Sequence, residues 1–115
     1  MCFALVAFPA YGKDITAEWD QEIFDGLTNW VLYASVDSPG GPYDYWESSI
    51  PYDGSEASHY TVTKVFPLQK GTHTYYFVLV AFAGVEHSSN SNEASVVMTG
   101  DIPAPAHFTV TITVQ

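Results

Sequence analysis

The longest apolar stretch of the chain is TYYFVLVAFA, at residues 74–83. Its β-branched and aromatic residues predict a strand, and Gly71 precedes it as a turn residue. Both faces of this strand would be apolar. One face carries Tyr75, Phe77, Leu79 and Ala81, and the other carries Tyr76, Val78, Val80 and Phe82. A strand with two apolar faces is covered on both sides, so the second face lies under neighbouring side chains of its own sheet or against another molecule.

Shorter strands are predicted on both sides of this stretch. Period-2 alternation or a short apolar run marks residues 3–8, 14–19, 30–36, 59–65, 94–99 and 108–114, with a weaker signal within 43–50. Residues 37–42 are rich in Gly and Pro and predict a turn, and residues 51–58 and 86–92 are polar loops. About seven or eight short strands at regular spacing predict an all-β, two-sheet sandwich.

Only residues 16–27 compete as a helix. Trp19, Ile23 and Leu27 are spaced by four, but the window is short and Gly26 weakens it. We therefore assign the first part to a strand and the rest to a loop with room for one helical turn.

Composition narrows the functional classes. The 115 residues include 13 Asp and Glu against 3 Lys and Arg, which gives a net charge of −10. Nucleic acids and anionic membranes select basic surfaces, so neither is an expected partner. A single cysteine, Cys2, leaves no intrachain disulfide and no cysteine-based zinc site. The start of the chain has no basic residue before its apolar stretch, so synthesis without a secretion signal is expected.

Three stretches together resemble a fibronectin type III domain over residues 3–99. They are a predicted strand that ends at Trp19, the turn and strand from Leu68-Gln69-Lys70-Gly71-Thr72 to Ala81, and Ser91-Asn92-Glu93-Ala94-Ser95-Val96. The resemblance implies an immunoglobulin-like two-sheet sandwich in which Trp19 packs beneath a sheet. Gly71 is followed by more residues before the aromatic pair than is usual in that family, and a β-bulge there is the expected accommodation.

The resemblance divides the chain into three parts. Residues 1–99 form the sandwich, residues 100–106 form a linker with Pro103 and Pro105, and residues 107–115 form an extra C-terminal strand. The predicted core combines inward-facing residues from four strands: Trp19, Trp30, Leu32, Tyr75, Phe77, Leu79 and Val96.

No catalytic or cofactor motif emerges from the polar residues, so we expect no enzyme activity, no cofactor and no metal site. The four histidines, His59, His73, His87 and His107, lack metal-ligand spacing. Acidic residues crowd residues 14–25, which fits either a solvated edge or, less well, a calcium-binding loop. Paired carboxylates would need a cleft for glycoside hydrolysis, and thin sandwiches rarely provide one.

Aromatic residues cluster in the middle loops beside several carboxylates. They are Tyr43, Tyr45, Trp46 and Tyr52. Three interpretations are open: the rings fill the end of the sandwich, they form a protein interface, or they stack on a glycan.

The C-terminal segment has the cleanest alternation in the chain. Phe108, Val110, Ile112 and Val114 would lie on one face, and three threonines on the other. An unpaired strand of this kind is an aggregation hazard. We therefore predict that residues 107–114 add to a sheet edge, either of a neighbouring subunit or of their own domain.

Two classes of function follow. The first is a non-enzymatic structural subunit that self-assembles or decorates a larger particle, with a phage virion implied by the resemblance. Its partners would be copies of itself or other structural subunits, and its location a virion or an extracellular surface. The second is an adhesion module that binds a glycan or a host surface, and a subunit of a bacterial extracellular filament is a further alternative. The fold alone does not decide between them.

Overall fold

The structure is a computed structural model that describes residues 12–101 and 105–113. All the regular structure in these residues is β. The strands are β1 (Gly12–Asp20), β2 (Asn29–Val36), β3 (Trp46–Pro51), β4 (His59–Pro67), β5 (Gly71–Ala83), β6 (Glu86–His87) and β7 (Ala94–Gly100). The predicted strand at residues 3–8 lies outside the described residues.

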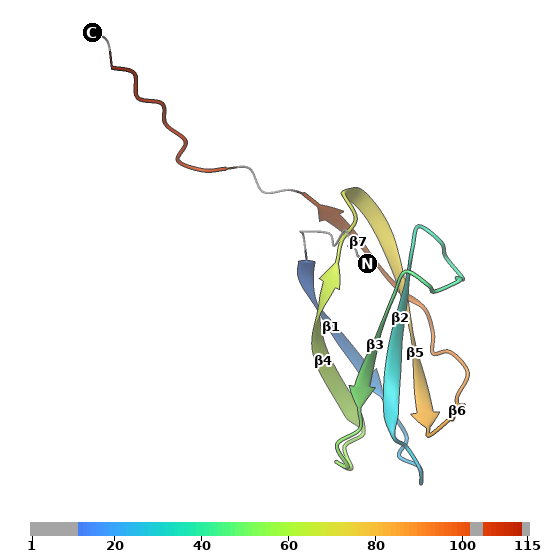
Figure 1. Cartoon of the computed structure of the whole chain (residues 1–115). Coiled ribbons are helices and arrows are strands. Elements are labelled where there is room, and N and C mark those ends of the chain that lie inside the picture. Colours follow the sequence, from blue (N-terminus) through green and yellow to red (C-terminus); the bar gives the residue numbers. More distant parts are fainter. Residues whose placement is uncertain (1–11, 102–104, 114–115) are drawn as a thin grey trace, which may run out of the picture.

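The strands form two antiparallel sheets that face each other as a sandwich (Figure 1). Within residues 12–101 and 105–113, one sheet consists of β1 and β4, paired from Gly12↔Pro67 to Asp20↔His59. The other sheet has the order β3-β2-β5. The remaining edge of β5 is shared by β7 and the short β6, which pair with different parts of it. The all-β sandwich predicted from the strand spacing is confirmed at this level.

The core lies between the sheets and has two adjoining clusters. The first gathers around Trp30 and Leu32 of β2, with Leu27, Ile50 and Ala81. The second gathers around Phe66 and Tyr75, with Ala34, Leu68 and Met98. Trp30 stands edge-on to Trp19 at 5.2 Å between ring centroids, which joins the two layers.

Most predicted core residues occupy the core. Trp30, Leu32 and Tyr75 are buried, and Trp19, Phe77 and Leu79 are partly buried against the clusters. Val96 is a correction, because its side chain is 42% exposed. It lies on an edge strand, where the two-stranded sheet opposite does not cover it. Of the two alternatives Val65 and Phe66 at the end of β4, Phe66 is the core residue, because the alternation from Tyr60 continues past Lys64.

The strand and loop assigned to residues 16–27 are confirmed, whereas the bulge expected after Gly71 is not. β1 ends at Asp20, and residues 21–28 form a loop with a turn at Asp25 and Gly26 and no helical turn. Gly26 has a φ of 95°, which a right-handed helix does not allow. The expected bulge after Gly71 is absent, because β5 pairs residue for residue with β7 from Gly71↔Gly100 to Phe77↔Ala94.

The second face of β5 is covered within its own sheet. Val78 and Val80 are buried, and their cross-strand partners are Tyr33 and Val31 of β2. For Val78 and Val80, side chains of the same sheet therefore provide the cover, and no second molecule is needed to bury them.

Candidate assembly site

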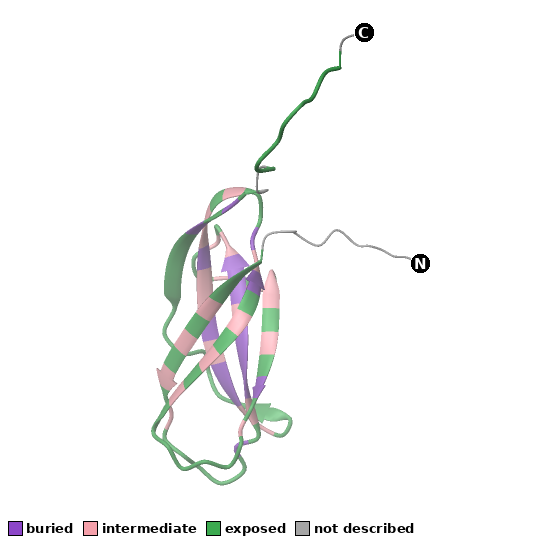
Figure 2. Ribbon diagram, turned by 90° about the vertical axis from the view of Figure 1, so that its left-hand side faces the viewer, coloured by how far each residue is buried: buried purple, intermediate pink, exposed green. Residues whose placement is uncertain are grey.

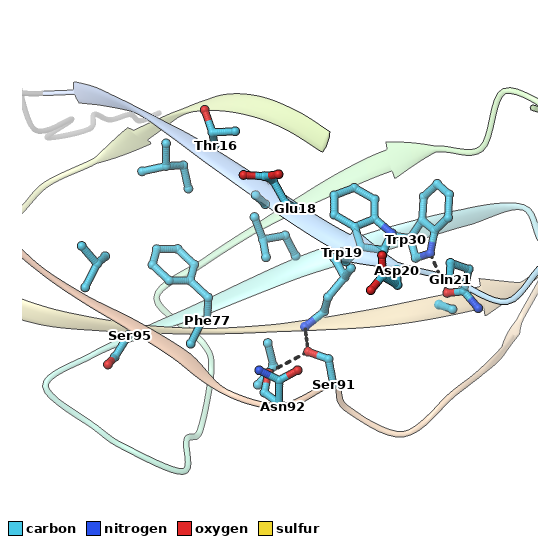
Figure 3. Close-up of a pocket in the computed structure, with 18 of the residues that line it drawn as sticks. Thr16, Glu18, Trp19, Asp20, Gln21, Trp30, Phe77, Ser91, Asn92 and Ser95 are labelled. Carbon is cyan, nitrogen blue, oxygen red and sulfur yellow. Dashed lines mark hydrogen bonds between the residues drawn. The ribbon is translucent and has the colours of Figure 1, made fainter. Parts of the chain in front are cut away.

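An open groove runs along the side of the sandwich between β1 and β7. It has a volume of about 1000 Å³. β1 contributes residues 13–20 to its wall, β7 contributes residues 94–98, and Phe77 and Leu79 of β5 also line it (Figure 3). In the part of the chain that the structure describes, one sheet has two strands and the other has five, so the smaller sheet leaves part of the larger one uncovered.

Both strands that border the groove are edge strands. Among the described residues, β1 pairs only with β4, and β7 pairs only with β5. Each therefore presents one row of main-chain N–H and C=O groups without a ladder partner in this part of the chain. Such a row is a template for pairing with another strand.

The inner wall of the groove is apolar. Ile15, Ala17 and Trp19 alternate along β1, and all three are partly buried against the first core cluster. Val96 adds its exposed side chain from β7. Trp19 Nε1 is buried and has no hydrogen-bond partner among the described residues, whereas Trp30 Nε1 donates to Gln21 Oε1 at 3.0 Å.

The loop before β7 closes the far end of the groove. Between β6 and β7, serine side chains take the place of a strand beside β5: Leu79 N–H donates to Ser91 Oγ at 2.9 Å and Ala81 N–H donates to Ser88 Oγ at 3.0 Å. This part of the β5 edge is therefore satisfied, and the edges that remain free along the groove in the described residues are those of β1 and β7.

The outer rim along β1 is acidic. Glu18 and Asp20 point away from the core and are well exposed. His59 on β4 contacts both, with Nδ1 at 2.9 Å from Asp20 Oδ1 and Nε2 at 3.2 Å from Glu18 Oε1. These hydrogen bonds, first to Asp20 and then to Glu18, raise the pKa of His59. This arrangement is a solvated acidic edge, and the part of the chain that the structure describes contains no group of three potential metal ligands placed to hold an ion.

A second histidine pair fixes the start of β5. His73 Nδ1 lies 2.6 Å from Asp37 Oδ2, and Nε2 lies 2.9 Å from the Lys70 carbonyl. The hydrogen bond to Asp37, followed by that to Lys70, raises the pKa of His73, and the His73 contact lowers the pKa of Asp37. Two acceptors around one imidazole favour its doubly protonated form. The pair is structural, because it ties the turn after β2 to β5.

The C-terminal segment is the most exposed apolar part of the described chain. Residues 105–113 form no strand and pair with none of the described strands. Phe108, Val110 and Ile112 are 81%, 68% and 79% exposed. The segment extends away from the end of β7 (Figures 1 and 2). Residues 105–113 therefore do not pair with a described edge of their own domain. Val114, the fourth apolar residue of the predicted strand, lies outside the described residues.

The four middle-loop aromatics are engaged within the domain. Tyr45 donates to the Pro67 carbonyl at 2.7 Å, and Trp46 stands against Phe66 at 4.9 Å between ring centroids. Tyr52 packs edge-on to Trp30 and its hydroxyl bonds the Ser55 carbonyl. Tyr43 donates to Glu93 at 3.1 Å. This packing agrees with the interpretation that these rings fill the end of the sandwich, so the assembly features gather elsewhere.

Sequence reasoning missed the groove. Its residues were assigned to the core, because alternation shows which face of a strand is apolar and not whether another layer covers it. No local pattern marks the groove, because its existence depends on how many strands each sheet contains.

Comparisons with protein-family models, with curated proteins and with solved structures gave no match to this chain. Within residues 12–101 and 105–113 there is no helix that could cross a bilayer.

Proposed function

We propose that this chain is a non-enzymatic structural subunit that self-assembles or joins other subunits in a larger particle. The observation that carries the proposal is the C-terminal segment, whose three large apolar side chains project into solvent from an extended backbone. Such a segment gains from burial against a protein surface, and main-chain pairing can fix its position.

The sandwich is proposed to be of the fibronectin type III kind. Support comes from Tyr75, whose hydroxyl accepts the Gln69 N–H at 2.9 Å, six residues upstream. A tyrosine that bonds the backbone shortly before its own strand is a feature of immunoglobulin-like sandwiches. The family resemblance makes a phage virion the first candidate for the particle and an extracellular surface the alternative location.

Native mass tests the proposal. We expect the full chain to exceed its monomer mass of 12.6 kDa in light-scattering chromatography, with the mass rising with protein concentration. Since the net charge of −10 opposes association, raising the salt from about 0.01 to about 1 M should strengthen it by screening. A monomer at every concentration and salt level contradicts the proposal.

Paired substitutions test the role of the segment. Ile112→Lys places a charge on its apolar face and should give a monomer. Thr111→Lys places the same charge on the opposite face and should preserve assembly. Equal assembly by both variants would contradict a role for the apolar face. Binding of the monomeric chain to a glycan array would instead favour an adhesion module.

A further inference from the structure

We infer that the groove between β1 and β7 receives residues 107–113 of a second copy of this chain as an added strand that pairs with the open edge of β1. This inference rests on the proposed self-assembly and names its acceptor site. It requires a fit in length, side-chain pattern, charge and direction.

The lengths match. β1 contains nine residues, so its open edge is about 30 Å long at about 3.3 Å per residue. An extended segment over residues 107–113 covers about 23 Å at the same rise, which leaves it within the ends of β1.

The side-chain patterns are complementary. Phe108, Val110 and Ile112 fall two residues apart, as do Ile15, Ala17 and Trp19 on the inner face of β1. Side chains that alternate in step keep the same face inward when a strand is added beside β1. The added strand would place its three exposed apolar side chains over Phe77 and Leu79 and beside Val96, and would thus supply the layer that this side of the sandwich lacks.

The segment carries no charge that would oppose docking beside the acidic rim of the groove. Residues 102–115 contain no Asp, Glu, Lys or Arg, although the whole chain carries −10. On the outer face, Thr109 and Thr111 would lie beside Glu18 and Asp20 of the acceptor. Threonine hydroxyls face these carboxylates without the repulsion that an acidic segment would meet.

The direction of the segment favours a second copy over its own domain. The segment departs beyond Gly100 at the end of β7 and points away from the groove beside that strand (Figure 1). Donor and acceptor are different surfaces of one chain, so the contact is heterologous, and each copy can give a strand and receive one. Repetition of such a contact builds an open filament or a closed ring.

A complementation experiment tests the inference with two full-length variants. Ile112→Lys disables the donor segment and leaves the groove intact. Val96→Lys places a charge in the groove at a position that is already 42% exposed, and leaves the segment intact. Each variant alone should be a monomer, and their mixture should contain a dimer, because one functional segment meets one functional groove and growth then stops. Val85→Lys, at a turn residue that is 94% exposed, is the matched control and should assemble like the unmodified chain.

The outcomes separate the inference from the proposed function. If Val96→Lys assembles as well as Val85→Lys does, the segment docks elsewhere, so the inference is wrong and the proposed function stands. If both single variants are monomers but the mixture also stays monomeric, the groove does not accept the segment, and the inference is wrong. If the unmodified chain never assembles, the proposed function itself is wrong.

A second groove variant guards against misfolding. Ala94→Lys changes an exposed residue at the start of β7, on the same wall of the groove. Its mixture with Ile112→Lys should also give a dimer, and unchanged circular dichroism would show that both groove variants are folded. Assembly by Ala94→Lys alone would count against the groove as the acceptor.

Discussion

β2 and β1 are strands of similar length in opposite layers, and their surroundings differ sharply. β2 pairs with β3 on one edge and β5 on the other, and both of its faces are largely buried. β1 pairs with β4 alone among the described strands, and every second side chain along it is exposed. Among the described residues, β2 has a strand on each side, whereas β1 has one on one side alone.

This difference separates stability from association. Around β2, apolar side chains are buried and main-chain groups are paired, and both contributions stabilise the fold. Few groups of this strand are therefore left to bind a partner. Around β1, an edge and an apolar face remain available for a partner. The same domain therefore has a self-sufficient layer and an incomplete one.

The largest test of this contrast compares two tryptophans. Trp30 is 2% exposed on β2, and Trp30→Ala should lower the free energy of unfolding by about 3–5 kcal/mol. Trp19 on β1 is only partly buried, so Trp19→Ala should lower it by less. Urea unfolding in the Ile112→Lys background measures both without a contribution from assembly. An equal or larger loss for Trp19→Ala would overturn the contrast.

A smaller loss of unfolding free energy is expected from removing the hydroxyl of Tyr75, near the start of β5. Tyr75→Phe keeps the buried ring but leaves the Gln69 N–H without its acceptor, which should cost about 1–3 kcal/mol. Tyr33→Phe is the control, since the Tyr33 hydroxyl has no hydrogen-bond partner among the described residues and should change the unfolding free energy little. Equal effects of the two substitutions would show that the Tyr75 hydroxyl contributes nothing specific.

The smallest effect is the dependence of stability on pH. In each sheet one histidine contacts carboxylate side chains, His59 on β4 and His73 on β5. The pKa values of His59 and His73 are raised in the folded chain, so both stabilise it below pH of about 6.5 and lose that effect as pH rises through the raised values. The lowered pKa of Asp37 acts at the acidic end, where its contribution is lost as pH falls through the folded value. The His73 pair is less exposed than the His59 pair and should have the larger effect.

Histidine NMR titration and urea unfolding across this range check both signs. Asp37→Asn removes the carboxylate that contacts His73, so it should lower the pKa of His73 and flatten the pH dependence of unfolding. A pH dependence that Asp37→Asn leaves intact would assign it to other groups.

Local patterns predicted the strands because the order of apolar and polar residues along a strand shows which of its faces are buried. The alternation of Ile15, Ala17 and Trp19 identified the inner face of β1, and the continuous apolar run at residues 74–83 identified a strand covered on both faces. The same patterns misplaced Val96, because its exposure depends on how far the opposite sheet extends. They also left the middle-loop aromatics undecided, since Tyr45 and Trp46 find their partners on β4 and β5, far along the chain.

By itself, the sequence determined an all-β chain, an acidic surface and an apolar, uncharged C-terminal segment, since these follow from residue type and spacing. Only the tertiary structure decided which sheet is complete, that a groove lies between β1 and β7, and that the C-terminal segment points away from its own domain. These features depend on the number of strands in each layer and on the direction in which the chain leaves the last one. Neither quantity is encoded in a short window, because each results from long-range pairing of strands.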